Sequence, residues 1–119
     1  MKMLGWVRRA AGAVRAWWAK WRRRTSFEGV TVCASQEDPS AEIGARKLVL
    51  IGMSDSPKWL RFACPCRCGE VLSLNLMASH RPRWAVRAHA DGTISVSPSV
   101  DVRTCGSHFW IRGNQINWV

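Results

Sequence analysis

The sequence is poor in acidic residues, and the shortage is concentrated near its start. Only 8 Asp and Glu residues stand against 18 Lys and Arg residues, which gives a formal net charge of +10. Residues 1–24 contain no acidic residue and eight basic ones, so they carry most of this excess. Because residues 25–119 are close to neutral, the basic balance describes an appended segment and does not predict a nucleic-acid-binding surface on the domain.

The sequence also lacks an apolar run long enough for a signal peptide or a membrane span. Arg8, Arg9 and Arg15 interrupt the apolar residues near the start, and no small-residue cleavage site follows them. The five cysteines are an odd number and four of them are clustered, which argues against a disulfide framework and for reduced thiols that hold a metal. We therefore expect a cytoplasmic protein.

Residues 1–25 are predicted to form a basic amphipathic helix. Apolar side chains recur there at spacings of three and four, at Leu4, Val7, Ala11, Val14, Trp18 and Trp21. Three interpretations are open for residues 1–24: a helix docked on the domain or on a partner protein, a helix lying on an anionic membrane surface, and a disordered basic arm. Docking is favoured, because a regular apolar stripe is usually buried. Nucleic acid is a less favoured partner for the same reason.

The remaining residues, 27–119, are predicted to form one small zinc-binding β domain. Short runs rich in Val, Ile, Leu and Trp alternate with Gly, Pro, Asp and Ser, and they predict strands over 29–34, 47–53, 59–63, 71–76, 84–89, 93–97 and 109–112. Together with the N-terminal helix this predicts an α+β fold, in which a mainly antiparallel β domain is held together by zinc.

The strongest chemical signal is a group of soft metal ligands. Cys64, Cys66 and Cys68 stand at alternate positions, and Cys105 and His108 follow with CxxH spacing. Zn²⁺ takes four thiolate or imidazole ligands in a tetrahedron, with sulfurs about 3.8 Å apart. Alternate residues of a straight strand lie roughly 6.8 Å apart, so the first segment must turn. Five candidates exceed four positions, and Cys64, which follows an apolar pair, is the first choice for the residue outside the shell.

Glu70 directly follows this segment and is a candidate general base. Glutamate is disfavoured within strands, and one that adjoins the last ligand stands where it could take a proton from a zinc-bound water. The alternative interpretation is a solvated strand residue.

These motifs resemble a family of small bacterial proteins that carry an uncharacterised domain. The family pattern is a CxCGCGE knuckle, a tryptophan, a GxxVSLxPSI stretch and C-x-SH-[FY]-x-I. Residues 45–119 match it in order through CPCRCGE, Trp84, the SPS of residues 97–99 and CGSHFWI. Arg67 and Pro65 depart from it, since a glycine and a small residue are usual there.

The resemblance implies a zinc-dependent peptidase that trims ubiquitin-like precursors. Members occur in operons with ubiquitin-like proteins and with their activating and conjugating enzymes. Position by position, it implies Cys66, Cys68, Cys105 and His108 as ligands. It also places Glu70 on the family's acidic position and Ser107 on its serine, where that serine could bond a ligand, orient substrate or cap a turn.

We therefore expect a zinc metallopeptidase that uses an open zinc site and Glu70 to process a ubiquitin-like precursor or conjugate. The alternative is a sealed structural zinc in a non-enzymatic module that binds a protein partner. Thiolate ligands weaken zinc as a Lewis acid, which favours the alternative. The occupancy of the fourth zinc position separates the two hypotheses.

Overall fold

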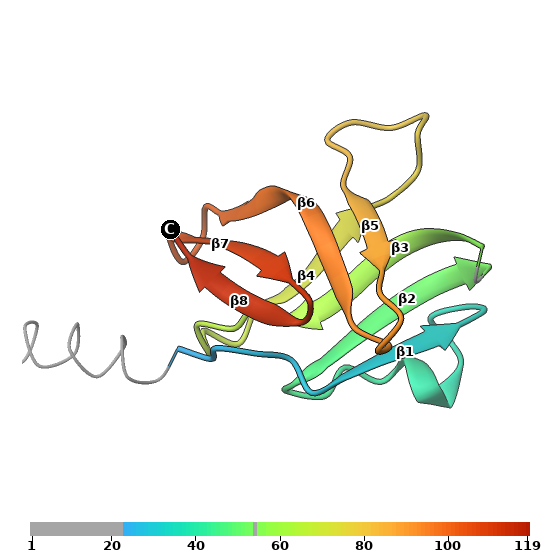
Figure 1. Cartoon of the computed structure of the whole chain (residues 1–119), viewed down its shortest axis with the longest axis horizontal. Coiled ribbons are helices and arrows are strands. Elements are labelled where there is room, and N and C mark those ends of the chain that lie inside the picture. The colour runs from blue at the N-terminus through green and yellow to red at the C-terminus, as the bar shows by residue number, and fades with distance from the viewer. Residues whose placement is uncertain (1–22, 54) are drawn as a thin grey trace, which may run out of the picture.

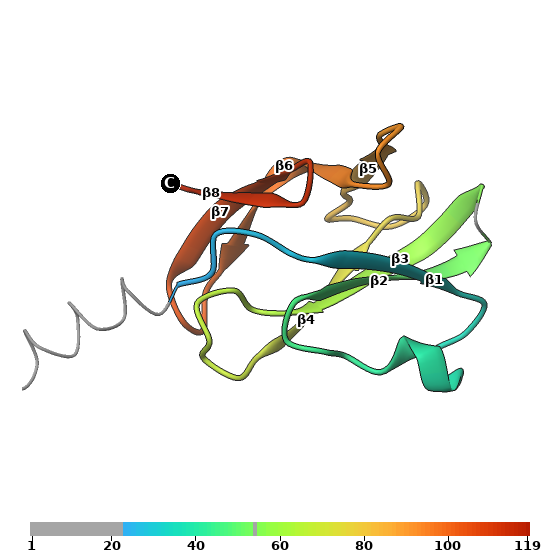
Figure 2. The same ribbon diagram turned by 60° about the horizontal axis from the view of Figure 1, so that its bottom comes forward.

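The computed structural model describes residues 23–53 and 55–119, which form two β-sheets packed face to face (Figure 1). The first sheet has the strand order β1-β2-β3-β4 and the second has the order β5-β6-β7-β8. Each sheet is thus built from strands consecutive in the chain. Figure 2 shows the two layers nearly edge-on.

Neighbouring strands are antiparallel except for β1 and β2, which are parallel. The first sheet contains β1 (Gly29–Cys33), β2 (Lys47–Met53), β3 (Ser56–Ala63) and β4 (Val71–Asn75). A short 3-10 helix, η1 (Pro39–Ala41), lies in the connection between β1 and β2. The second sheet contains β5 (Ala85–Ala88), β6 (Ile94–Val102), β7 (Ser107–Arg112) and β8 (Gln115–Trp118).

Aromatic side chains link the two sheets through the core. Phe62 of β3 meets Phe27 edge-on at 5.3 Å between ring centroids, and it meets Phe109 of β7 at 6.2 Å. Both Phe62 and Phe109 are fully buried. Edge-to-face aromatic pairs add attraction beyond the apolar area that they bury. The alternation of buried and exposed residues along β6 and β7 places one face of the second sheet against this core and leaves the other outward.

The β7–β8 hairpin and the segment before β1 are joined at one turn residue. Gly113 and Asn114 have φ of 56° and 63°, the positive values that a two-residue hairpin turn requires. The buried Asn114 accepts a hydrogen bond from Ile94 N–H through its side-chain oxygen, and its carbonyl accepts one from Phe27 N–H. The turn therefore fixes β6, β8 and the incoming chain together.

The predicted α+β class is wrong for the described residues, which are all β apart from η1. The helical component rested entirely on residues 1–25. Of these, 1–22 lie outside the described residues, and 23–25 are not helical. The predicted strands are confirmed as β1 to β7, with β6 longer than expected, and β8 was missed. No helix in the described ranges has the length and apolarity needed to cross a bilayer.

Candidate active site and metal centre

Four cysteines converge at one end of the core. The sulfurs of Cys64, Cys66, Cys68 and Cys105 all lie within 4.8 Å of one another. Cys64 Sγ is 3.4 Å from Cys66 Sγ and 3.8 Å from Cys105 Sγ. Sulfurs that share a tetrahedral zinc lie about 3.8 Å apart, so this donor set fits such an ion with all four positions filled by protein.

The first three cysteines lie on a tight turn between β3 and β4. Cys64 N–H donates to Glu70 C=O at 2.8 Å and Arg67 N–H donates to Cys64 C=O at 3.0 Å, which folds the segment back on itself. Arg67 and Gly69 have φ of 67° and 91°. Arginine takes this left-handed conformation at a steric cost that glycine avoids, and Arg67 stands where the family pattern has a glycine.

The electrostatics of the cysteines favour a bound cation. Burial raises the pKa of the Cys64 thiol, and burial also raises the pKa of the Cys68 thiol. Burial opposes ionisation of Cys66 too, but hydrogen bonds from Ser107 and from the neighbouring thiols outweigh it and lower its pKa to about 7. One thiolate is therefore accessible near neutral pH, whereas ionising Cys64 and Cys68 close to it is favoured by a compensating positive charge.

His108 does not join the cysteines but pairs with a serine. Its Nε2 lies 2.8 Å from Ser99 Oγ, and both side chains are half-buried. Ser99 is on β6 and His108 on β7, and their inward-facing neighbours Val100 and Phe109 are buried. The pair therefore lies on the outward face of the second sheet. A hydroxyl within hydrogen-bond reach of an imidazole is the arrangement of an activated nucleophile and its base.

An irregularity in β6 brings Ser99 to His108. Val96 pairs with Ile111 and Val100 pairs with Phe109, so four positions along β6 span only two along β7. Such bulges bend a strand and redirect its side chains, and they are common beside active sites. The indole N–H of Trp84 donates to Ser99 C=O at 3.3 Å and holds the backbone of the bulge.

Asp101 is the acidic residue placed next to the imidazole by strand register. It pairs directly with His108 across β6 and β7. His108 C=O accepts a hydrogen bond from Val119 N–H, so its backbone groups face β8 and not β6. Asp101 and His108 are thus a non-hydrogen-bonded pair, in which side chains on the same face come closest. Asp101 is exposed and lies opposite His108 on the outward face of the second sheet.

The two residues expected to be catalytic lie apart from this pair. Ser107 is buried and its Oγ is 3.1 Å from Cys105 Sγ, so it belongs to the cysteine cluster. Glu70 is exposed at the end of the cysteine turn, where its carbonyl accepts from Cys64 N–H. Of the five expected metal ligands, the structure brings together the four cysteines, including Cys64. Sequence reasoning gave Ser99 no role, although it stands in the PS motif that carried the resemblance.

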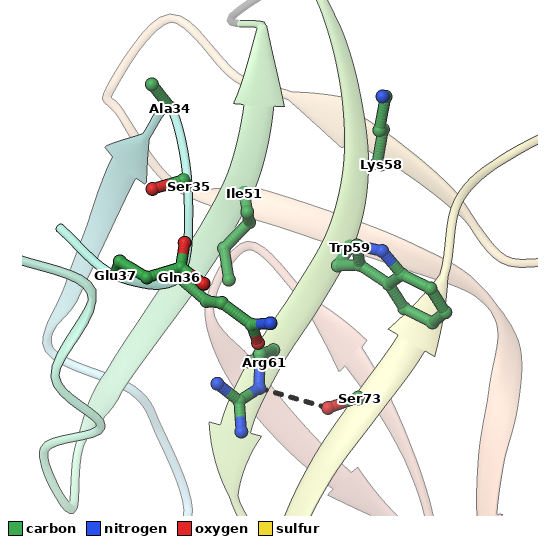
Figure 3. A pocket seen from close by; sticks show the side chains of 9 residues that line it. All are labelled: Ala34, Ser35, Gln36, Glu37, Ile51, Lys58, Trp59, Arg61 and Ser73. Carbon is green, nitrogen blue, oxygen red and sulfur yellow. Dashed lines mark hydrogen bonds between the residues drawn. The ribbon is translucent and has the colours of Figure 1, made fainter.

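A separate hollow lies on the outward face of the first sheet (Figure 3). Trp59 and Arg61 of β3 line it, together with the segment that follows β1, and the Arg61 guanidinium donates to Ser73 Oγ at 3.1 Å. None of the residues that line it belongs to the Ser99–His108 pair or to the cysteine cluster.

Comparison with known families gives a match over residues 34–119 to the family described as bacterial ubiquitination-like system serine protease (BubE). The chain belongs to this family. The resemblance found from the sequence motifs is therefore confirmed, and the family description supports a peptidase role in such a system. It names a serine protease, whereas the sequence motifs had predicted a zinc metallopeptidase. Comparisons with curated proteins and with solved structures give no match.

Proposed function

We propose that the protein is a serine peptidase in which Ser99 is the nucleophile and His108 is the general base. The observation that carries this proposal is the 2.8 Å contact between Ser99 Oγ and His108 Nε2. His108 takes the hydroxyl proton as Ser99 Oγ attacks the scissile carbonyl, and it then gives that proton to the leaving amine. Water, activated by the same imidazole, hydrolyses the acyl-enzyme and frees Ser99.

Asp101 supports this cycle through its charge. Whenever His108 holds the proton it is an imidazolium, and a carboxylate on the adjacent strand stabilises that form. The residue is exposed, so solvent screens the interaction. Asp101 is therefore assigned an electrostatic role, with Ser99 and His108 carrying the bond-making steps.

The four cysteines are proposed to hold a structural zinc ion. They come from the β3–β4 turn and from the β6–β7 connection, so their ligation would join the two sheets at the end of the core. A site with four protein ligands is closed and contributes folding free energy. Ligation of Cys105 would also fix the position of His108, because Cys105 lies three residues before His108 and precedes the start of β7. Ser107 is hydrogen-bonded to Cys105 and orients that ligand.

The proposed substrate is a ubiquitin-like protein precursor or conjugate, which is cleaved in the cytoplasm. Support comes from the family, whose description places it in a ubiquitination-like system.

The proposal is tested by covalent labelling with a fluorophosphonate, which reacts with activated serines. We expect label on the Ser99-containing peptide of the native protein and none on Ser99→Ala. Cleavage of a C-terminally extended ubiquitin-like protein from the same operon should fall at least about 10³-fold in Ser99→Ala. Ser107→Ala is the control that separates the two serines. Label on Ser107, or native cleavage by Ser99→Ala, would contradict the assignment.

A further inference from the structure

Strand β6 continues past its neighbour β5. β6 runs from Ile94 to Val102, but its pairing with β5 ends where Ser97 meets Ala85. Among the described residues no strand pairs with Ser99–Val102 on the side away from β7. Figure 1 shows this second half of β6 bordered by β7 on one side only. The second sheet therefore has an open edge that begins at Ser99.

The backbone groups of Asp101 point to that open edge. Because Asp101 and His108 form a non-hydrogen-bonded pair, the Asp101 N–H and C=O face away from β7. Ser99 is two residues earlier in the same strand, and its C=O faces the same side, where it accepts from Trp84. Asp101 is exposed. Within residues 23–53 and 55–119, no strand pairs with the N–H and C=O of Asp101, which lie along the same strand edge as Ser99, the proposed nucleophile.

We propose that this edge of β6, at Asp101, binds the extended segment of the substrate next to the scissile bond as an added β-strand. The inference rests on the proposed function of Ser99. Residues two apart in a strand lie about 6.8 Å apart, and paired strands lie about 4.8 Å apart. A peptide paired with Asp101 therefore passes Ser99 at the distance of a neighbouring strand. Strand addition of this kind takes its affinity from main-chain hydrogen bonds.

This edge selects a class of substrate. A chain segment must leave its own N–H and C=O groups free in order to pair with Asp101, which segments inside a helix or sheet cannot do. The substrate class is thus a protein with an extended, unstructured tail at the cleaved bond. The enzyme recognises the main-chain groups of this tail more than its side chains. The opening is short, and the tail must be free over only a few residues.

A second copy of the protein is a less suitable occupant of this edge. The unpaired stretch is only Ser99–Val102, it is bent by the bulge, and it carries an exposed charge at Asp101. Short length, bulges and charged residues are the features that prevent edge-to-edge association of sheets. The same features still allow a single flexible peptide to bind. Because the edge is continuous with Ser99, a peptide bound there lies next to the proposed nucleophile.

The test compares Asp101→Pro with Asp101→Ala. Both variants remove the carboxylate, but only proline removes the backbone N–H, and proline is tolerated at edge positions where that N–H makes no ladder bond. Each variant is assayed on a synthetic peptide that spans the cleavage site and on p-nitrophenyl acetate, which is too small to pair with the edge. We expect the ratio of peptide to ester kcat/KM to be about 3- to 10-fold lower for Asp101→Pro, the effect of one backbone hydrogen bond.

A second measurement uses the native protein and so does not depend on the folding of a variant. Peptides N-methylated at single positions near the scissile bond should include one that is cleaved about 3- to 10-fold more slowly. Equal ratios for the two variants, with equal cleavage of all methylated peptides, would overturn the inference while fluorophosphonate labelling of Ser99 still stood. Absence of that labelling would overturn the proposed function and this inference with it. A dimer of the native protein that Asp101→Pro dissociates would assign the edge to a second copy and overturn the inference.

Discussion

Replacing His108 by asparagine separates catalysis from metal binding. Among the residues that the structure describes, the His108 side chain hydrogen-bonds to Ser99 alone and lies outside the cysteine cluster. Loss of one such bond lowers the free energy of unfolding by about 0.5–1.5 kcal/mol, which in a domain of this size lowers Tm by roughly 2–12 °C. Loss of the general base lowers kcat/KM by about 10²- to 10⁴-fold. We therefore expect a folded, metal-loaded and nearly inactive variant.

The assay combines peptide cleavage, thermal melting and metal content of the purified protein by mass spectrometry. Cys105→Ser is the matched control three residues away, because it removes a sulfur that lies 3.8 Å from Cys64 Sγ. That variant should lose metal and fold together, since binding of a structural metal contributes directly to folding free energy. If His108→Asn lost its metal as completely as Cys105→Ser while Ser99→Ala kept it, His108 would be a ligand and the catalytic assignment would be refuted.

Two further predictions concern residues away from the Ser99–His108 pair. Glu70→Gln should leave both cleavage rate and metal content within about twofold of the native values, because Glu70 is exposed and lies apart from the Ser99–His108 pair. A loss of cleavage of about 100-fold or more with metal retained would restore the zinc-water mechanism. Asn114→Ala should lower the free energy of unfolding by roughly 1–3 kcal/mol, measured by urea denaturation, because it leaves Ile94 N–H buried without a partner and places alanine at positive φ. Asn114→Gly relieves only the backbone strain and should recover part of that loss. If Asn114→Ala were as stable as the native protein, this account would be contradicted.

The local pattern of the sequence was sufficient to predict most of the strands. Period-two alternation and turn residues located seven of the eight, because these signals act over a few neighbouring residues. β8 (Gln115–Trp118) was missed because it is short. Within the described ranges it pairs with β7 across the Gly113–Asn114 turn and with Ser26 through a single bridge, and neither partner is apparent from its own four residues. The α+β class was wrong because it extended a helical pattern in residues 1–25 to the class of the whole chain.

The sequence by itself determined which chemistry was present: clustered thiols suited to a metal, and motifs specific enough to identify the family. It did not determine how those groups are combined. Tertiary structure decided that Cys64 joins Cys66, Cys68 and Cys105 and that His108 faces Ser99. The physical reason is register. Successive strand residues point to opposite faces, so Ser107 faces inward to the cysteines while His108, one residue later, faces outward. Only the pairing of β6 with β7, with its two extra residues before Val100, fixes which serine that outward histidine meets.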